Sequence, residues 1–292
     1  MTSLKTKKAE PFQVINAIVL LMVSVVTIYP FWNILVISLS DYKTYLDYPV
    51  QFLPLRPTLE NYAALLSDSG VVRSLAVSGA VTAGGVLYNM FLTVTMAYGL
   101  SKQNYAGRKL FWAVALIPMF FSGGLVPTYV LVANWLRLRN SILSMILPLG
   151  INLWYLIIIK NFFSGIPQSL HESARIDGAN ELRVLGAIVL PMSMPVLVTF
   201  VLFYGVDRWN EWFNCMLYIN DSKLYTLQYM LREMVVKASG QRSMEYSFGS
   251  AHTFLAGIKM AGVVFAVLPI LAVYPFLQKY FVTGVVLGAV KG

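Results

Sequence analysis

The fold of this chain is decided by the stretch PFQVINAIVLLMVSVVTIYPFWNILVISLS, residues 11–40, which contains no Asp, Glu, Lys or Arg. A membrane-crossing helix needs about 20 consecutive apolar residues, so these 30 residues are long enough for one span. Lys5, Lys7 and Lys8 precede the stretch, as basic residues do in a signal peptide. Because the apolar part of a signal peptide is only about 7–15 residues long, we predict an uncleaved membrane helix over residues 14–39.

Five further stretches also lack charged side chains. They cover residues 74–101, 110–136, 140–159, 184–206 and 260–278. With the first stretch they predict an all-α membrane protein of six transmembrane helices within a single transmembrane domain, residues 1–292. The predicted spans are residues 14–39, 74–99, 110–134, 141–162, 192–217 and 258–281. Gly123, Gly124 and Pro127 are expected to break the third span.

The composition excludes several other classes of protein. Hydrophobic residues make up 58% of the chain and charged residues 12%, about half the charged share of soluble proteins. This argues against a secreted enzyme, a nucleic-acid-binding domain and a disordered scaffold. The net charge is +9, and the basic residues that produce it lie between the apolar stretches. We therefore expect these residues to contact the headgroups of a lipid bilayer, and we expect no nucleic acid partner.

The sequence offers no catalytic or metal site. Cys215 is the only cysteine, so neither an intramolecular disulfide nor a multi-cysteine metal site can form. The chain contains neither a P-loop nor a Gly-x-Ser-x-Gly motif. We therefore predict no catalytic residues, no metal and no cofactor held by this chain itself.

The charges that flank the first span predict the orientation. Three lysines precede it and only Lys43 closely follows it, and basic residues favour the cytoplasmic side. Six spans then place both termini and the connection 163–191 in the cytoplasm. The loops 40–73 and 218–257 are predicted to lie outside.

The connection between the fourth and fifth spans contains PQSLHESARIDGANELRVLGAIVLP, residues 167–191. Ser169 and Glu172 have the spacing of a capping box, which predicts a helix that begins at Leu170. Gly178 suits the left-handed position that ends such a helix.

A second helix is expected directly after this turn. Asn180 can cap its start, and it must stop near Pro191. Two interpretations of the short first helix remain open: it rests on the lipid surface, or it docks a soluble partner.

The same residues carry a family resemblance. The pattern Glu172-Ser173-Ala174-x-x-Asp177-Gly178-Ala179, followed by Ile188-x-Leu190-Pro191-x-x-x-Pro195, resembles the EAA motif. That motif marks the membrane subunits of binding-protein-dependent ABC importers. Ser173 stands where alanine is usual, and Leu185 stands where phenylalanine is common.

The resemblance extends along the whole chain. It includes the length, the six spans, Trp209-Asn210-Glu211-Trp212 in the fifth span and the glycine-rich end from Gly284. These features are similar to the carbohydrate-uptake branch, the MalG-like subunits, and within it to the LplC-like group. That group includes the permease of an alginate importer.

The resemblance implies a type I ABC importer permease fold and a mechanical function. The first helix of the EAA loop would be a cytoplasmic coupling helix in a groove of a separate ATPase. The implied contact positions are Glu172, Ser173, Ala174, Asp177, Gly178 and Ala179. The chain would be no enzyme, because two copies of the partner ATPase hold ATP and Mg.

The resemblance also implies further partners. A homologous permease would complete a heterodimer in the bacterial plasma (inner) membrane, and an extracytoplasmic solute-binding protein would deliver a saccharide. An acidic oligosaccharide such as one from alginate is allowed. The loop 218–257 would reach toward the binding protein.

The fifth span carries a second polar constellation. Asp207, Asn210, Glu211 and Asn214 are spaced i, i+3, i+4 and i+7, which predicts one shared helix face. A charge this deep in a bilayer costs about 3 kcal/mol or more against lipid, so the face should contact protein or water.

Two interpretations of this face are weighed. In the first, these residues line a saccharide pathway together with Arg208 and Trp212, because carboxylates and amides bind hydroxyls and aromatic planes cover sugar rings. In the second, Arg208 forms a purely structural ion pair with Asp207 or Glu211. Asn89, Asn152 and Tyr155 in other spans are weaker pathway candidates.

Two other functions compete with the importer. An ion-coupled secondary transporter would use Asp207 or Glu211 to bind the coupling ion, but no inverted repeat is evident in the sequence. A membrane-embedded enzyme such as a glycosyltransferase would need an acidic cluster at a membrane surface, and the sequence contains none.

Overall fold

The computed structural model describes residues 11–48, 50–102, 105–240 and 254–289. The basic flank of Lys5, Lys7 and Lys8 lies outside these residues, as do the segment 241–253 of the predicted outer loop and the terminal residues 290–292. The described residues form helices and turns, with one isolated β-bridge and no strand. The prediction of an all-α protein is confirmed.

The chain divides into two compact units. The first comprises residues 1–68 and 238–267, and the second comprises residues 69–237 and 268–292. Two helices, α14 (Leu227–Gly240) and α15 (Leu255–Ala289), contribute residues to both units.

The first unit begins with a long apolar helix. It contains α1 (Pro11–Ser38), α2 (Tyr42–Asp47) and α3 (Glu60–Ser67), and α1 continues through Pro30. The amide nitrogen of Asn61 donates to the carbonyl oxygens of Ser38 and Ser40, both at 2.9 Å, and so ties α3 to the end of α1.

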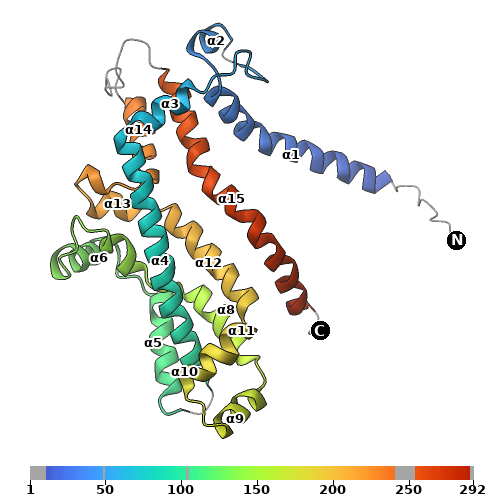
Figure 1. Ribbon diagram of the computed structural model, residues 1–292, viewed down its shortest axis with the longest axis vertical. Coiled ribbons are helices and arrows are strands. Elements are labelled where there is room, and N and C mark those ends of the chain that lie inside the picture. Colours follow the sequence, from blue (N-terminus) through green and yellow to red (C-terminus); the bar gives the residue numbers. More distant parts are fainter. Residues whose placement is uncertain (1–10, 49, 103–104, 241–253, 290–292) are drawn as a thin grey trace, which may run out of the picture. The chain divides into compact units, whose positions relative to one another are not determined.

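The second unit is organised around α4 (Ser69–Ser101), as Figure 1 shows. This helix contacts α5 (Arg108–Phe120), α7 (Leu143–Ile146), α8 (Leu153–Ser164) and α12 (Met194–Trp209). The remaining helical elements of the unit are α6 (Leu125–Val130), η1 (Leu131–Trp135), η2 (Leu147–Leu149), α9 (Gln168–Ile176), α10 (Glu181–Val184), η3 (Leu185–Val189), α11 (Leu190–Met192), α13 (Phe213–Tyr218) and η4 (Ser222–Leu224).

The largest buried cluster of this unit joins α4 and α8 to the 163–191 connection and α12. Its members include Tyr98, Leu156, Phe163, Val189 and Phe200, all nearly inaccessible. Because these side chains come from elements up to about 100 residues apart in the chain, they fix where the connection packs against the spans.

Among the residues that the structure describes, three helices are long and apolar enough to cross a membrane: α1, α4 and α15 from Leu255 to Val273. Three further pairs pass the same test together but are bent. The bend is 113° between α5 and α6–η1, 53° between α7–η2 and α8, and 86° between α10–α11 and α12. Counting each bent pair as one span gives six.

Three predicted spans therefore differ from continuous helices. The third breaks between Phe120 and Leu125, where the glycines were expected to interrupt it, and Gly124 has φ of 82°. The fourth breaks between Leu149 and Leu153. The fifth is not one helix over 192–217, because α12 ends at Trp209 and α13 starts only at Phe213.

Candidate functional site

The predicted docking helix exists as α9, and its end is built as the sequence indicates. Gly178 has φ of 77°, in the left-handed region. Its N–H donates to the carbonyl of Arg175 at 3.0 Å, and the N–H of Ala179 donates to that of Ala174 at 2.9 Å. This pair of bonds is a Schellman motif, which satisfies the last carbonyls of the helix. The expected role of Gly178 in ending the helix is confirmed.

The start of α9 differs from the prediction. The helix begins at Gln168, directly after Pro167, and no side chain caps it. Ser169 therefore lies inside the first turn, so the capping box is wrong. The carboxylate of Glu172 instead accepts from the side-chain amide of Gln168 at 2.8 Å.

The second helix of the connection starts as predicted. The side chain of Asn180 accepts from the backbone N–H of Arg183 at 2.9 Å and caps α10. The helix then continues as a π-helical turn and ends at Met192, one residue after Pro191.

The residues of the EAA-like motif divide between two faces of this connection. Ala174 and Ala179 are half-buried and pack against the large core cluster. On the outer face the exposed positions are Glu172, Ser173, Asp177 and Gly178. Ile176 is 86% exposed, which is unusual for a β-branched apolar side chain in a folded unit. The outer face is thus polar at its edges and apolar at Ile176.

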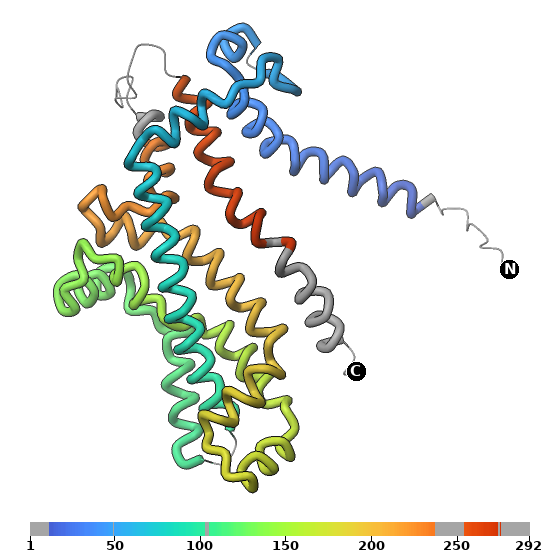
Figure 2. Tube along the Cα trace, in the orientation of Figure 1, coloured from blue at the N-terminus to red at the C-terminus, as the bar shows by residue number. Residues whose placement is uncertain are grey.

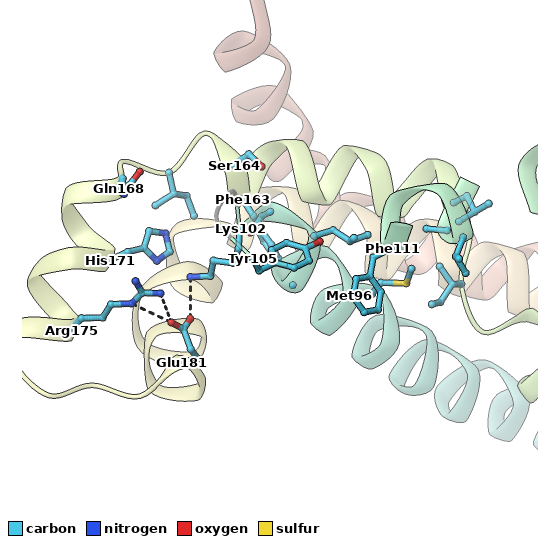
Figure 3. A pocket seen from close by; sticks show the side chains of 18 of the residues that line it. Met96, Lys102, Tyr105, Phe111, Phe163, Ser164, Gln168, His171, Arg175 and Glu181 are labelled. Atoms are coloured by element: carbon cyan, nitrogen blue, oxygen red, sulfur yellow. Dashed lines mark hydrogen bonds and ion pairs between the residues drawn. The ribbon is translucent and has the colours of Figure 1, made fainter. Parts of the chain in front are cut away.

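Glu181 ties this connection to the end of α4, as Figure 3 shows. Its Oε2 accepts from the hydroxyl of Tyr98 at 2.5 Å and from Nζ of Lys102 at 3.0 Å. Its Oε1 accepts from Nη2 of Arg175 at 2.5 Å. These hydrogen bonds, first that from Tyr98 and then those from Arg175 and Lys102, lower the pKa of Glu181 from 4.5 to about 2. Sequence reasoning missed Glu181, because its partners lie up to 83 residues away.

The ends of these elements gather at one end of the second unit. Figures 1 and 2 show α9 and α10 beside the end of α4 and the start of α5. Glu181 binds both Arg175 of α9 and Tyr98 of α4 and so connects the two helices, and α4 in turn contacts α8 and α12.

Arg208 binds backbone carbonyls and an amide rather than a carboxylate. Its Nη1 donates to the carbonyl of Met145 at 2.8 Å, and its Nη2 donates to Oδ1 of Asn89 at 3.0 Å and to the carbonyl of Leu149. Asn89 also donates to the carbonyl of Leu149, at 3.1 Å. Arg208 is only 3% exposed.

The break between α7 and α8 explains this arrangement. Where a helix ends, its last carbonyls lose their intrahelical partners, and Pro148 supplies no N–H of its own. In a membrane such groups must be satisfied by protein, and the guanidinium of Arg208 does so. Gly85 makes room for it, since a Cβ there would lie 2.8 Å from Cδ of Arg208.

The alternative of a structural ion pair at Arg208 is wrong. The ion pairs Lys102–Glu181 and Arg175–Glu181 of the described residues do not involve Arg208. Arg208 does have a structural partner, but that partner is Asn89 with the freed carbonyls.

The predicted polar face of the fifth span is also wrong, because the helix stops before it is complete. Asn210 follows the last residue of α12 and is exposed. Glu211 is buried at 7% exposure and accepts from the backbone N–H and the side-chain amide of Asn214, both at 2.9 Å. It thus caps α13.

One face of the Trp212 ring is covered by another side chain. The guanidinium carbon of Arg232 in α14 lies 3.7 Å from the centroid of its ring, a cation–π contact. The ring of Phe213 meets it edge to face at 5.5 Å. These contacts join α14 to the turn after α12.

The pathway candidates that remain accessible are fewer than predicted. Asp207 is exposed, and its Oδ2 accepts from the hydroxyl of half-buried Tyr155 at 3.1 Å. The ring of Tyr155 lies 5.7 Å from that of Phe203, which is 38% exposed. Asn152 is engaged, because its side chain caps α8 by accepting from the N–H of Trp154 at 3.0 Å.

This architecture defines a class of protein: a helical membrane protein with an exposed short helix, α9, in the connection between two of its candidate spans. Residues 90–286 match the family model described as the binding-protein-dependent transport system inner membrane component. The chain belongs to this family and is a permease subunit of an ABC importer, a transporter rather than an enzyme.

Its relatives cover nearly the whole chain. It is 42% identical to Protein LplC of Bacillus subtilis (strain 168), over 98% of this chain and 97% of that protein. It is 40% identical to the polygalacturonan/rhamnogalacturonan transport system permease protein YtcP of the same organism, over 94% and 96%.

A solved structure has the same fold. It is the crystal structure of a bacterial ABC transporter involved in the import of the acidic polysaccharide alginate. The match has a TM-score of 0.86 and 27% identity, and covers 94% of this chain and 100% of that one. The predicted type I permease fold and the family resemblance are confirmed.

Proposed function

We propose that this chain moves an oligosaccharide across the bacterial plasma membrane, driven by a separate ATPase that docks on α9. The observation that carries the proposal is the outer face of α9. Ile176 is 86% exposed there, next to exposed Glu172 and Asp177, whereas Ala174 on the inner face packs on the core. A helix with one anchored face and one exposed, partly apolar face fits a groove in a partner.

The remaining assembly follows from this docking. Two ATPase copies supply ATP and Mg, and a homologous permease completes a heterodimer. Both termini and the 163–191 connection face the cytoplasm, and loops 40–73 and 218–257 face a solute-binding protein outside. The family description, which names a binding protein, supports this last partner. Nothing in the comparisons supports the ion-coupled alternative at Asp207 or Glu211.

The substrate we propose is an acidic oligosaccharide. The names of two similar proteins refer to polygalacturonan or rhamnogalacturonan and to alginate, and alginate is called an acidic polysaccharide. Among the predicted pathway residues, Asp207 and Asn210 are exposed and Tyr155 is half-buried, and the ring of Phe203 lies 5.7 Å from that of Tyr155. Such a surface can bind sugar hydroxyls and one ring face. The roles of the other predicted residues in the substrate pathway stay a prediction. We propose that buried Arg208, Asn89 and Glu211 influence the pathway by holding the backbone around it.

The docking proposal is tested by co-purification from the native membrane in mild detergent, with the bound proteins identified by mass. Wild type should retain a P-loop ATPase, and Ile176→Glu should lose most of it. Leu66→Glu is the matched control, because Leu66 is also exposed but lies on α3, in the loop predicted to face outside. An ATPase that is absent from wild type, or that stays with Ile176→Glu as it does with the control, refutes docking on α9.

The substrate proposal needs a separate measurement. Uptake by the reconstituted complex with its binding protein should favour uronate oligosaccharides over neutral oligosaccharides of equal length. Equal uptake of both would remove the acidic class while leaving the importer assignment intact.

A further inference from the structure

A pocket of about 1010 Å³ lies beside α9, between the end of α4, α5 and α8. Its volume is at the upper end of the roughly 300–1,000 Å³ found for small-molecule sites. Figure 3 shows that its two ends differ: Met96 and Phe111 lie at one end, and Lys102, His171, Arg175 and Glu181 lie at the other.

The apolar end belongs to the membrane part of the protein. Phe111, Val114 and Pro118 are spaced i, i+3 and i+7, so they form one face of α5. Phe111 and Val114 are 59% and 57% exposed, so no other part of the described chain covers this wall. Beside a span that lies in lipid, an open apolar wall of this kind accepts hydrocarbon.

The polar end has hydrogen-bond donors left over. Both carboxylate oxygens of Glu181 are already occupied by Tyr98, Lys102 and Arg175. Lys102 has three N–H donors and Arg175 has five, so each keeps donors that Glu181 does not use.

His171 adds an unsatisfied polar atom at the same place. Its Nδ1 is buried and has no hydrogen-bond partner. Burial lowers the pKa of His171, and the positive charge of Lys102 adds to the effect, so the protonated imidazole is disfavoured there. A buried polar atom without a partner indicates a missing ligand or water.

The free groups at this end are donors rather than acceptors. The charges of Lys102 and Arg175 are balanced by those of Glu172 and Glu181, so the lining has no net charge. Both carboxylates are already engaged, Glu181 by Tyr98, Lys102 and Arg175 and Glu172 by Gln168, whereas Lys102 and Arg175 keep donors. The pocket therefore combines a donor-rich end with a hydrocarbon wall, at the boundary between a span and the 163–191 connection.

We propose that this pocket binds a membrane phospholipid, with its phosphodiester at Lys102, His171 and Arg175 and an acyl chain along the wall of Phe111, Val114 and Pro118. A phosphodiester carries one negative charge and only acceptor oxygens, which complements the free donors. The lipid would join α9 to α4 and α5 and so help to hold the docking helix in place. The inference concerns binding alone and does not depend on the proposed substrate.

Native mass spectrometry of the delipidated full-length protein in an alkyl maltoside tests this inference. Dioctanoyl phosphatidylglycerol is titrated as the probe. Wild type should bind a first molecule of this lipid more tightly than any further molecules. His171→Phe removes the unpaired nitrogen without breaking any hydrogen bond that the described residues show, and should weaken this binding about tenfold, the effect of one charge-assisted hydrogen bond.

A second variant fills the apolar end. Val114→Trp should abolish binding of the lipid, and Val126→Trp on α6 is the matched control, because Val126 is also an exposed valine but is not part of the pocket lining. Thermal unfolding of each variant verifies that it is folded.

Three results would overturn the inference. In the first, the first molecule of dioctanoyl phosphatidylglycerol binds with equal affinity to wild type, His171→Phe and Val114→Trp. Inorganic phosphate alone competes as well as the lipid, which would make the site a plain anion site. Or the binding is unchanged when a dioctanoyl glycerol without phosphate replaces the lipid, which would make it a plain apolar groove.

Discussion

The substitution Glu181→Gln tests how firmly the docking segment is joined to α4. It keeps the shape of the side chain and removes its charge. Lys102 and Arg175 then lose their carboxylate, and Tyr98 loses a charged acceptor at 2.5 Å.

The magnitude follows from two estimates. A pKa that falls from 4.5 to about 2 corresponds to about 3.4 kcal/mol if fully expressed. The side chain of Glu181 is 49% exposed, however, so solvent screens the ion pairs to about 0.2–1 kcal/mol each. We expect a loss of about 1.5–2 kcal/mol at pH 7, most of it from the hydrogen bond of Tyr98.

The pH dependence gives this prediction a direction. Because the pKa of Glu181 is lower in the folded chain than in the unfolded chain, its ionised form stabilises folding fully above pH 4.5. The stabilisation is lost as the pH falls from 4.5 toward 2, and less than half of it remains at pH 3. The difference in stability between wild type and Glu181→Gln should therefore be smaller at pH 3 than at pH 7.

The assay is thermal unfolding of the detergent-solubilised chain, followed by circular dichroism at pH 7 and pH 3. We expect the midpoint of Glu181→Gln to fall by about 3–7 °C at pH 7. Glu172→Gln is the control, since that carboxylate is exposed and accepts only from Gln168, and it should leave the midpoint unchanged. Equal midpoints for the two variants at pH 7, or a difference that stays constant down to pH 3, would refute the reasoning.

Three further substitutions test the other parts of the site. Gly178→Ala should cost about 1 kcal/mol in unfolding free energy, because φ is 77° there although no atom lies within 4 Å of a new Cβ; Gly178→Asn should cost less, and equal losses for both would contradict the strain argument. Arg208→Met should cost about 3–5 kcal/mol, because it leaves buried carbonyls without a donor; a thermal midpoint like that of wild type would show that the guanidinium is dispensable. Asp207→Asn should keep the thermal midpoint, because the amide oxygen can still accept from Tyr155, and should lower oligosaccharide uptake several-fold; unchanged uptake would remove Asp207 from the pathway.

The docking segment shows what local sequence can predict. Gly178 ends α9 and Asn180 starts α10 because each acts through its own backbone angles or through an N–H three residues away. The start of α9 differs from the predicted one because two local signals compete there. Ser169 has the right spacing for a capping box, but the helix already begins at Gln168, directly after Pro167 and two residues before the predicted start at Leu170.

The fifth span shows the opposite case. The spacing from Asp207 to Asn214 predicts one helix face only if the helix continues, and it ends at Trp209. Glu211 is bound there by Asn214 and by Thr226, whose hydroxyl donates to the carbonyl of Glu211 at 2.7 Å. The contact with Thr226 comes from the segment after α13, so the helix pattern alone could not reveal it.

The sequence by itself determined the class of this protein. Long stretches without charge can be accommodated only as membrane helices, and the EAA-like motif and its glycine identify the importer family through residues that interact locally. Only the tertiary structure decided the partners of Arg208 and Glu181. Arg208 binds carbonyls freed by a helix break about 60 residues earlier, and Glu181 meets Tyr98 across 83 residues. Such partners are set by where packed helices bring distant backbone breaks and chain ends together, and no periodicity along the chain encodes that distance.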